Sequence, residues 1–150
     1  MKGWLRLALC FYTFLMAVQL STAVRNARLD AIETTIGASG VLKIRTGSPP
    51  ATCATADSGT VLATINLPTD WMAAASGGSK AKSGTWDDTS ADNSGTAAHF
   101  RVYAFDGVTC GLQGTVTLTA GGGDMTLDNT AIVAGQYITI TGFTLTDGNS

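Results

Sequence analysis

The chain has 150 residues, of which only 13% are charged, and its formal net charge is −2. This length fits one domain, and low charge combined with moderate hydrophobicity excludes an intrinsically disordered chain. The Lys and Arg residues are spread along the sequence without a cluster that could neutralise phosphates, so nucleic acid is not an expected partner. Abundant Gly, Thr and Ala favour strands and tight turns over long helices.

The N-terminal segment has two interpretations that place the protein in different compartments. A basic start, an apolar run over residues 7–20 and the small residues Ser21-Thr22-Ala23 are typical of a secretory signal peptide, which would export the chain. Met16 offers an alternative start that would make residues 1–15 an upstream extension. The apolar run is shorter than the roughly 20 residues that a membrane-spanning helix needs, so we expect no stable membrane insertion of the mature body.

A short helix is predicted over residues 21–36. Ser21 or Thr22 can act as its N-cap by accepting hydrogen bonds from the free amides of the first turn. Gly37 follows where a C-terminal cap requires a left-handed residue. The chain therefore divides into three predicted parts, a leader or upstream extension, a helical segment and a β domain, over residues 1–15, 16–39 and 40–150.

The predicted helix carries one narrow apolar stripe, formed by Leu29, Ile32 and Ile36 at spacings of three and four residues. Arg25 and Arg28 occupy part of the remaining surface. A stripe this short is marginal in isolation, so the helix must dock on something. Its own β domain is the simplest partner. The alternative is an assembly helix, which packs against the same helix in other subunits or into a groove on a larger assembly.

From Gly40 onward the apolar residues alternate with period two, which is the pattern of half-buried strands. The predicted strands cover residues 41–45, 61–67, 80–86, 97–105, 109–118, 125–127 and 136–145.

Three further features interrupt or join the predicted strands. Asp106-Gly107 predicts a tight hairpin turn. Trp71–Ala75 is an apolar patch that could form one helical turn, and Gly142 could mark a β-bulge. These patterns predict a mainly β chain: a small antiparallel β-sandwich or barrel-like domain preceded by a short N-terminal helix.

The two cysteines of the predicted β domain, Cys53 and Cys110, are candidates for a disulfide that closes a long loop. Export would favour this bond, whereas synthesis and retention in a cytoplasm would favour two free thiols. Together with the single histidine, His99, they cannot supply the four spaced ligands of a zinc site. No metal and no cofactor are expected.

Two tryptophans offer a weak candidate for glycan contact, because aromatic faces stack on sugar rings. Packing in the core is the favoured interpretation of both Trp71 and Trp86. His99 lies in the middle of a predicted strand, without a nucleophile in a recognisable setting, so we expect a structural role for it.

The acidic residues suggest turns rather than chemistry. Asp87, Asp88 and Asp92 form an oxygen-rich loop that could bind calcium, but their spacing differs from the EF-hand loop, so a solvated turn is favoured. Asp124 and Asp128 sit beside glycine and asparagine, as turn residues do, and a catalytic carboxylate pair is not expected.

Several stretches of the sequence carry a resemblance to one known family. They are Ser21–Glu33, Leu62–Thr64 with Leu67-Pro68, Asp70–Ala75, Gly95–Arg101, Gln113–Val116 and Asp124–Thr130. These stretches resemble small, uncharacterised virion-associated proteins encoded by tailed bacteriophages and prophages. The resemblance covers about residues 16–150, and members of that family start close to Ser21, which favours Met16 as the start.

The resemblance implies a non-enzymatic structural protein of the virion, a head-decoration or tail-associated component made in the host cytoplasm. The partners it implies are other virion proteins and further copies of the chain, and it provides no catalytic residues. Two alternatives stay open: an adhesin-like module that binds glycans or a host surface, and a secreted bacterial β domain with a disulfide. A hydrolase is the least supported function, because no acid, base and nucleophile converge in the sequence.

Overall fold

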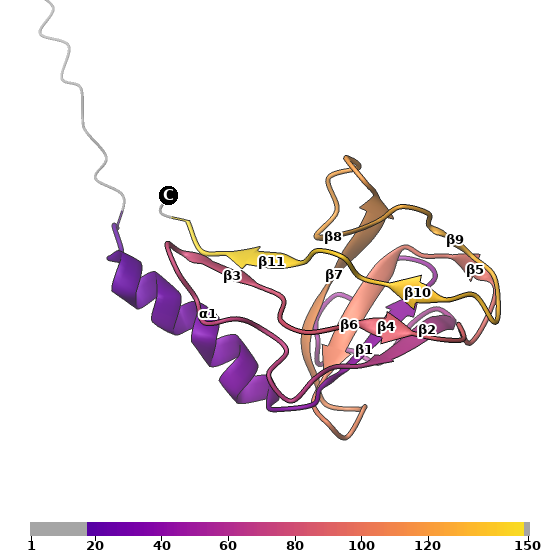
Figure 1. Cartoon of the computed structure of the whole chain (residues 1–150), viewed down its shortest axis with the longest axis horizontal. Helices are drawn as coiled ribbons and strands as arrows, with labels where there is room; N and C mark the ends of the chain where they lie inside the picture. Colours follow the sequence, from indigo (N-terminus) through magenta and orange to yellow (C-terminus); the bar gives the residue numbers. More distant parts are fainter. Residues whose placement is uncertain (1–17, 149–150) are drawn as a thin grey trace, which may run out of the picture.

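The computed structural model describes residues 18–148, which form one helix followed by short strands (Figure 1). The choice between a leader and a start at Met16 therefore lies outside the described residues. The helix, α1, spans Thr22–Ile36. The strands are β1 (Val41–Arg45), β2 (Val61–Asn66), β3 (Ser79–Ala81), β4 (Asp87–Asp88), β5 (Gly95–Thr96), β6 (His99–Tyr103), β7 (Cys110–Leu118), β8 (Met125–Leu127), β9 (Ala131–Ile132), β10 (Ile138–Thr139) and β11 (Thr144–Thr146).

The predicted capping of the helix is confirmed at both ends. Ser21 is the N-cap, and its hydroxyl accepts a hydrogen bond from the amide of Val24 at 3.3 Å. Gly37 is the C-cap with φ of +91°, and its amide donates to the Glu33 carbonyl. A left-handed conformation at this position favours glycine because it has no Cβ.

The largest sheet has five strands in the order β2-β1-β6-β7-β8 and curls into a half-barrel (Figure 1). Its pairs are antiparallel except for β7 and β8, which run parallel. Three two-stranded ladders, β10–β4, β11–β3 and β5–β9, complete the fold. The prediction of a mainly β, barrel-like domain after a short N-terminal helix is confirmed.

The central strands are buried on both faces. Leu42 and Ile44 of β1 and Phe100 and Val102 of β6 are at most 1% exposed and belong to the hydrophobic core. Phe143, from the segment between β10 and β11, packs edge-on against Phe100 with ring centroids 5.6 Å apart, which closes the core over the sheet. Because successive side chains of a strand point to opposite faces, the intervening residues of β1 and β6 lie on the second face.

Three predicted elements differ in the structure. Trp71–Ala75 is not helical: Met72 forms an antiparallel bridge with Lys82. The predicted strand over residues 80–86 is wrong beyond Ala81, where β3 ends, and β4 begins only at Asp87. The predicted strand over residues 136–145 is divided between β10 and β11. In both regions the chain changes partner, since β4 pairs with β10 and β3 with β11. Such tertiary pairing is not encoded by local alternation.

Candidate functional site

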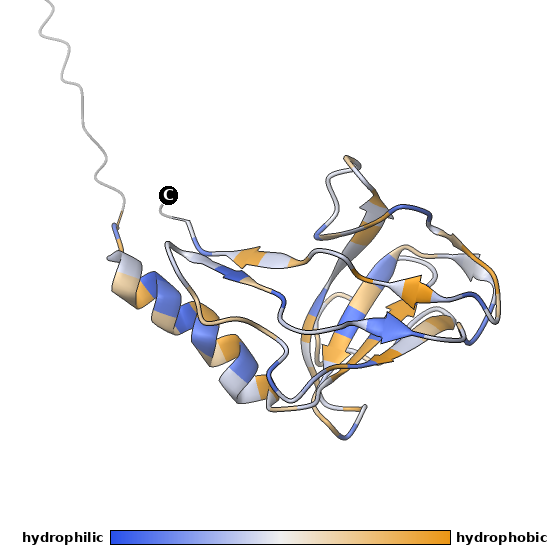
Figure 2. Ribbon diagram, viewed as in Figure 1, coloured by the Kyte–Doolittle hydropathy of each residue, from blue (hydrophilic) through white to orange (hydrophobic). Residues whose placement is uncertain are grey.

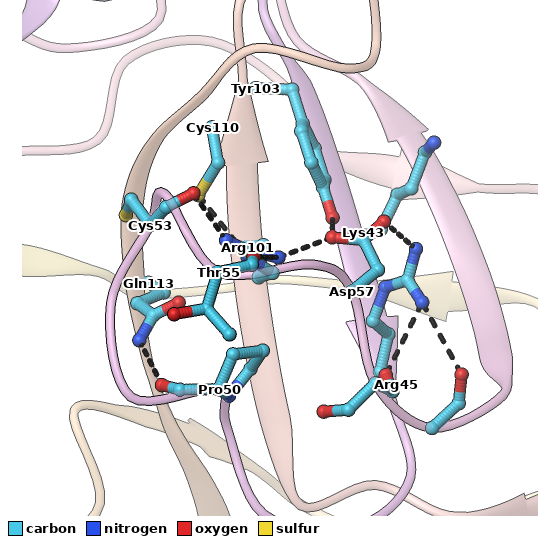
Figure 3. A network of polar contacts seen from close by, with 12 residues as sticks. Lys43, Arg45, Pro50, Cys53, Thr55, Asp57, Arg101, Tyr103, Cys110 and Gln113 are labelled. Atoms are coloured by element: carbon cyan, nitrogen blue, oxygen red, sulfur yellow. Dashed lines mark hydrogen bonds and ion pairs between the residues drawn. The ribbon is translucent and has the colours of Figure 1, made fainter.

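A buried polar layer lies on the second face of β1 and β6, beneath the loop of residues 46–60 (Figure 3). We define this layer as Lys43, Arg45, Asp57, Arg101 and Tyr103. Arg45, Arg101 and Tyr103 are only 6%, 1% and 1% exposed. Burial of two cations is costly unless each charge is paired and each donor is satisfied, so the loop that covers them must supply acceptors.

Asp57 supplies the negative charge of the polar layer. Its Oδ2 accepts from Arg45 Nη2 at 2.6 Å, and its Oδ1 accepts from Arg101 Nη1 and, at 2.7 Å, from the hydroxyl of Tyr103. One carboxylate from the loop therefore bridges two arginines and a tyrosine from two neighbouring strands.

Backbone carbonyls of the covering loop satisfy further donors. Arg101 Nη1 donates to the carbonyl of Thr55 at 3.2 Å, and Arg101 Nη2 donates to that of Cys53 at 2.7 Å. Arg45 Nη1 donates to two more carbonyls, those of Ser58 and Gly59, at 3.3 Å each. The two guanidinium groups thus fix the path of the loop, which has no regular secondary structure of its own.

The environment sets the protonation states of this layer. For Asp57, burial favours the neutral acid, but the Tyr103 hydroxyl and the charges of Arg45 and Arg101 outweigh burial and lower the pKa. Burial and the hydrogen bond to Asp57 raise the pKa of Tyr103 to about 12. Near neutral pH the carboxylate is charged and the phenol is neutral, so neither is suited to exchange protons with a substrate.

Cys53 and Cys110, the predicted disulfide pair, lie beside this layer with both thiols free. Arg101 Nε donates to Cys110 Sγ at 3.2 Å. Burial and hydrogen bonding to Cys110 raise the pKa of Cys53 to about 11. The structure thus brings together two cysteines that are far apart in sequence, one in the loop and one at the start of β7.

His99 has the structural role predicted for it. Its ring is fully buried, and Nδ1 lies 2.7 Å from the carbonyl oxygen of Gly47, at the start of the covering loop. Nε2 is buried without a hydrogen-bond partner. Burial lowers the pKa of His99, and the charges of Arg45 and Arg101 add to this effect against the opposing hydrogen bond to Gly47. The ring is therefore neutral, with Nδ1–H as the donor.

Trp71 and Trp86 pack in the core, which confirms the favoured interpretation. The weaker hypothesis that they contact a glycan is wrong. Both side chains are 0% exposed, and their ring centroids lie 6.0 Å apart. Each indole N–H is satisfied internally, by the carbonyl of Gly37 for Trp71 and by that of Ser83 for Trp86. Aromatic faces that pack against each other inside the core cannot stack on a sugar.

The acidic residues of the oxygen-rich loop, for which the sequence favours a solvated turn over calcium binding, accept hydrogen bonds from neighbouring segments. Asp88 accepts from the amides of Thr64 and Ser90 at 2.9 Å each, and Asp92 accepts from the Thr64 hydroxyl. Among residues 18–148, no group of three or more His, Cys, Asp or Glu residues could hold a metal ion.

The second pair of acidic residues is likewise engaged in local hydrogen bonds. Asp124 accepts from the amide and the hydroxyl of Thr115, which lowers its pKa, and Asp128 accepts weakly from Thr119 at 3.4 Å. Each carboxylate stabilises the loop to which it belongs, as expected of turn residues.

Helix α1 docks through polar side chains as well as its apolar stripe. Asn26, Asp30 and Glu33 form a ladder one helical turn apart, and their oxygens accept from the amides of Gly78, Ala75 and Met72, in that order, at 2.9–3.0 Å. The spacing of three residues along the extended segment matches the spacing of three and four along the helix. The helix thus supplies hydrogen-bond acceptors to the backbone amides of the extended segment over residues 72–78.

Lys80 is the buried counterion of this ladder. Its side chain is 3% exposed, and Nζ binds Asp30 at 2.8 Å, Glu33 at 3.0 Å and the carbonyl of Ala73 at 2.9 Å. Burial alone would lower the pKa of Lys80, but the two carboxylates outweigh burial and raise it.

The residues predicted for an assembly helix are divided between internal contacts and an open surface. Leu29 and Ile36 are buried, at 4% and 6% exposed. Arg25 Nη1 donates to the carbonyl of Asp147 and Arg28 pairs with its carboxylate, so α1 also binds the last described strand region. Most of the apolar stripe is thus buried within the chain. Figure 2 shows hydrophilic and hydrophobic residues alternating along the helix.

An open groove remains beside α1. It has a volume of about 270 Å³. The groove is lined by Arg28, Ala31, Ile32, Thr35, Ile36 and, from β7, Gly111. A Cβ at Gly111 would lie 2.4 Å from Ile36 Cγ1, so glycine allows the helix and the strand to approach closely.

A second hollow, of about 170 Å³, surrounds Tyr137. The ring is 55% exposed, and its hydroxyl donates to Asp87 Oδ2 at 2.8 Å, which fixes its orientation. The residues that line the hollow are Leu127, Asp128, Asn129, Gln136, Tyr137, Ile138 and Thr139. Carboxylate, amide and hydroxyl groups thus surround an exposed aromatic face without a cation.

Sequence reasoning did not single out Asp57, Arg101 or Lys80, on which the two polar networks depend. One signal was available: period two places Lys43 and Arg45 on one face of their strand, and Arg101 and Tyr103 on one face of theirs. The charges on such a strand face must either be exposed to solvent or be paired with Asp or Glu from a segment that covers the face.

Comparisons of the chain with protein families, with curated proteins and with solved structures give no match. Within residues 18–148 there is no helix with the length and apolar character needed to cross a membrane.

Proposed function

We propose that this protein is a non-enzymatic structural component of a tailed-bacteriophage particle, a head-decoration or tail-associated subunit that acts by packing and oligomeric assembly. The observation that carries the proposal is the open groove beside α1. It exposes aliphatic parts of Ala31 and Ile32 above the buried Ile36, on a helix that internal hydrogen bonds hold in place. A preorganised apolar surface binds a partner without an additional ordering cost.

The chemistry of the polar layer and of its neighbours Cys53 and His99 also supports a structural role. Asp57 is held charged, Tyr103 and Cys53 are held neutral, and His99 is enclosed, so none of these groups offers a proton-transfer site near neutral pH. The resemblance of residues 16–150 to virion-associated proteins suggests the particle, and further copies of the chain are the expected partners.

The direct test is quantitative mass spectrometry of particles purified from a strain that carries this gene. We expect the chain at a fixed number of copies per particle after removal of free protein on a density gradient. If the particles lack the protein, the proposal is wrong.

A matched pair of variants tests the role of the groove. Ala31→Glu places a charge in the groove, whereas Ala23→Glu places the same charge on the exposed first turn of α1, outside it. We expect Ala31→Glu to reduce incorporation into particles, and self-association in native mass spectrometry, by about tenfold or more. Ala23→Glu should assemble normally. Equal incorporation of both variants would show that the groove is not an assembly surface.

The Tyr137 hollow favours a second candidate function, binding of a neutral glycan. Its exposed ring can stack on the C–H face of a sugar, and Asp128, Asn129 and Gln136 can bind hydroxyl groups. The absence of Lys and Arg among the lining residues disfavours anionic ligands. On a glycan array, binding should be lost in Tyr137→Ala and retained in Phe105→Ala, which removes another exposed aromatic side chain. If the wild-type chain binds no glycan on the array, this function is excluded.

A further inference from the structure

We propose that Cys53 and Cys110 form an intramolecular disulfide when the protein meets a low-molecular-weight disulfide oxidant, and that this bond ties the loop of residues 46–60 covalently to β7. This inference does not depend on the virion proposal, because it concerns the chain alone.

The geometry brings both cysteines to one guanidinium. Arg101 Nε donates to Cys110 Sγ at 3.2 Å, while its Nη2 donates to the carbonyl of Cys53 at 2.7 Å (Figure 3). Interaction with the Cys110 thiol also contributes to the raised pKa of Cys53. Arg101 is itself fixed by Asp57, so the loop cysteine and the strand cysteine are both bound to one anchored guanidinium group.

An oxidant can reach this pair from the surface. Cys53 lines an open hollow of about 320 Å³ together with Asp57, Arg101 and Val108. In the proposed reaction, Cys53, which lines this hollow, is the first cysteine to react. Cys110, which contacts Arg101 behind it, is placed to complete the exchange.

The reaction consists of two thiol–disulfide exchanges. With oxidised glutathione as the oxidant, Cys53 loses its proton and its sulfur attacks one glutathione sulfur. The glutathione S–S bond breaks, and one glutathione leaves as a thiolate that takes up a proton. Cys110 then loses its proton and attacks Cys53 Sγ, which displaces the second glutathione. Overall, two protein thiols are oxidised to one disulfide, and one glutathione disulfide is reduced to two thiols.

The Cys53–Cys110 disulfide would hold the loop of residues 46–60 in the position that it already has. The loop is already held by Asp57 and by carbonyls that bind Arg45 and Arg101. The two contacts of Cys110 Sγ, with Arg101 Nε and with the Leu112 carbonyl, are the ones that would change. A cross-link between residues 53 and 110 closes a long loop in the unfolded chain, which reduces the entropy of that state and stabilises the fold.

The test uses the full chain with Cys10→Ser, so that the two cysteines in question are the reactive ones. After incubation with oxidised glutathione, we expect a monomer lighter by two hydrogen atoms and a protease fragment that joins the peptides containing residues 53 and 110. Its Tm should exceed that of the reduced chain by about 5 °C or more. Proteolysis within residues 46–60 should slow by at least fivefold.

Two single variants identify the order of exchange. In this background, Cys110→Ser should stop at a stable mixed disulfide of Cys53 with glutathione, because the second sulfur is missing. Cys53→Ser should react more slowly with glutathione, since Cys110 does not line the hollow. For the parent chain, the pKa of about 11 at Cys53 predicts an oxidation rate that rises about tenfold per pH unit between pH 7 and 10.

Three results would overturn the inference. The first is a folded chain that keeps both thiols in the presence of excess oxidised glutathione. The second is cross-linking between molecules instead of within one. The third is an intramolecular bond that leaves loop proteolysis and Tm unchanged.

Discussion

Asp57 and Arg101 form an ion pair between a loop and the centre of a sheet. Arg101 is 1% exposed, whereas the carboxylate of Asp57 is 37% exposed, so the loop residue lies between the buried cation and the solvent. A buried guanidinium without its counterion carries a large desolvation penalty. The ion pair therefore couples the position of the loop of residues 46–60 to the stability of the whole fold.

Asp57→Asn should destabilise the protein by about 2–3 kcal/mol, the lower part of the usual range for breaking a buried ion pair, because partial exposure of Asp57 allows water to compensate. Urea unfolding followed by tryptophan fluorescence measures the change. Asp70→Asn is the matched control, since Asp70 is exposed and makes no hydrogen bond or ion pair among the described residues. A similar free energy of unfolding for both variants would contradict the role of Asp57.

Stability should decline as the pH falls below about 6.5, the ordinary pKa of histidine. The folded-state pKa of His99 is lowered, so below that pH the unfolded chain binds a proton that the folded chain does not, and acid favours unfolding. The slope can reach about 1.4 kcal/mol per pH unit, until the pH falls to the folded-state pKa.

His99→Gln tests this assignment, because glutamine retains an amide donor for the Gly47 carbonyl but does not titrate. Urea unfolding between pH 7 and 5 should show a flatter dependence in the variant. Loss of stability below about pH 4 should persist in both proteins, since Asp57 and Asp124 have lowered pKa values and lose their contribution only when they are protonated. An unchanged slope above pH 5 would assign the effect to another group.

Gly59→Ala should destabilise the protein by about 3 kcal/mol or more. Gly59 has φ of +70°, and a Cβ there would lie 1.9 Å from the carbonyl oxygen of Thr46, a backbone atom that cannot move without opening the loop. Gly47→Ala is the matched control, because Gly47 has a similar φ of +74° but open space around it, and should cost about 1 kcal/mol. If both variants lower the free energy of unfolding by the same amount, the close approach of Gly59 to Thr46 is not maintained in solution.

Lys80→Met should weaken the docking of α1 by about 1–2 kcal/mol, because it leaves Asp30 and Glu33 without their shared cation while it retains the apolar stem. Hydrogen exchange should accelerate in α1 and at the amides of Ala75 and Met72. Lys82→Met is the control, since the Lys82 ammonium donates only to the Gly84 carbonyl among the described hydrogen bonds; this variant should leave α1 protected.

The contribution of Lys80 should also be lost at alkaline pH. Its folded-state pKa is raised above the ordinary value of 10.5, so the stabilisation is fully present below that pH and disappears as the pH rises through the folded-state pKa. Lys80→Met should therefore flatten the stability profile above about pH 10.5. A profile identical to that of the parent chain would contradict the assignment.

Local patterns in the sequence are sufficient to predict the short-range elements of this protein. Ser21 and Gly37 set the ends of α1, because capping depends on residues next to the helix. Asp106-Gly107 predicted the turn between β6 and β7, where the Asp106 carboxylate accepts from the amides of Val108 and Thr109. Alternation identified the core faces of β1 and β6, since period two follows from the geometry of a strand.

The contacts between groups that are distant in sequence, by contrast, follow from the folded arrangement of the elements. Nothing in the local sequence joins Asp57 to Arg101, or Lys80 to Asp30 and Glu33, because each contact depends on how a loop or an edge segment crosses another element. Likewise, β4 and β3 take partners from the C-terminal segment, which shortens the predicted strands. These contacts stabilise the fold because a cation that is removed from water has a large desolvation penalty unless a counterion lies beside it in the folded chain.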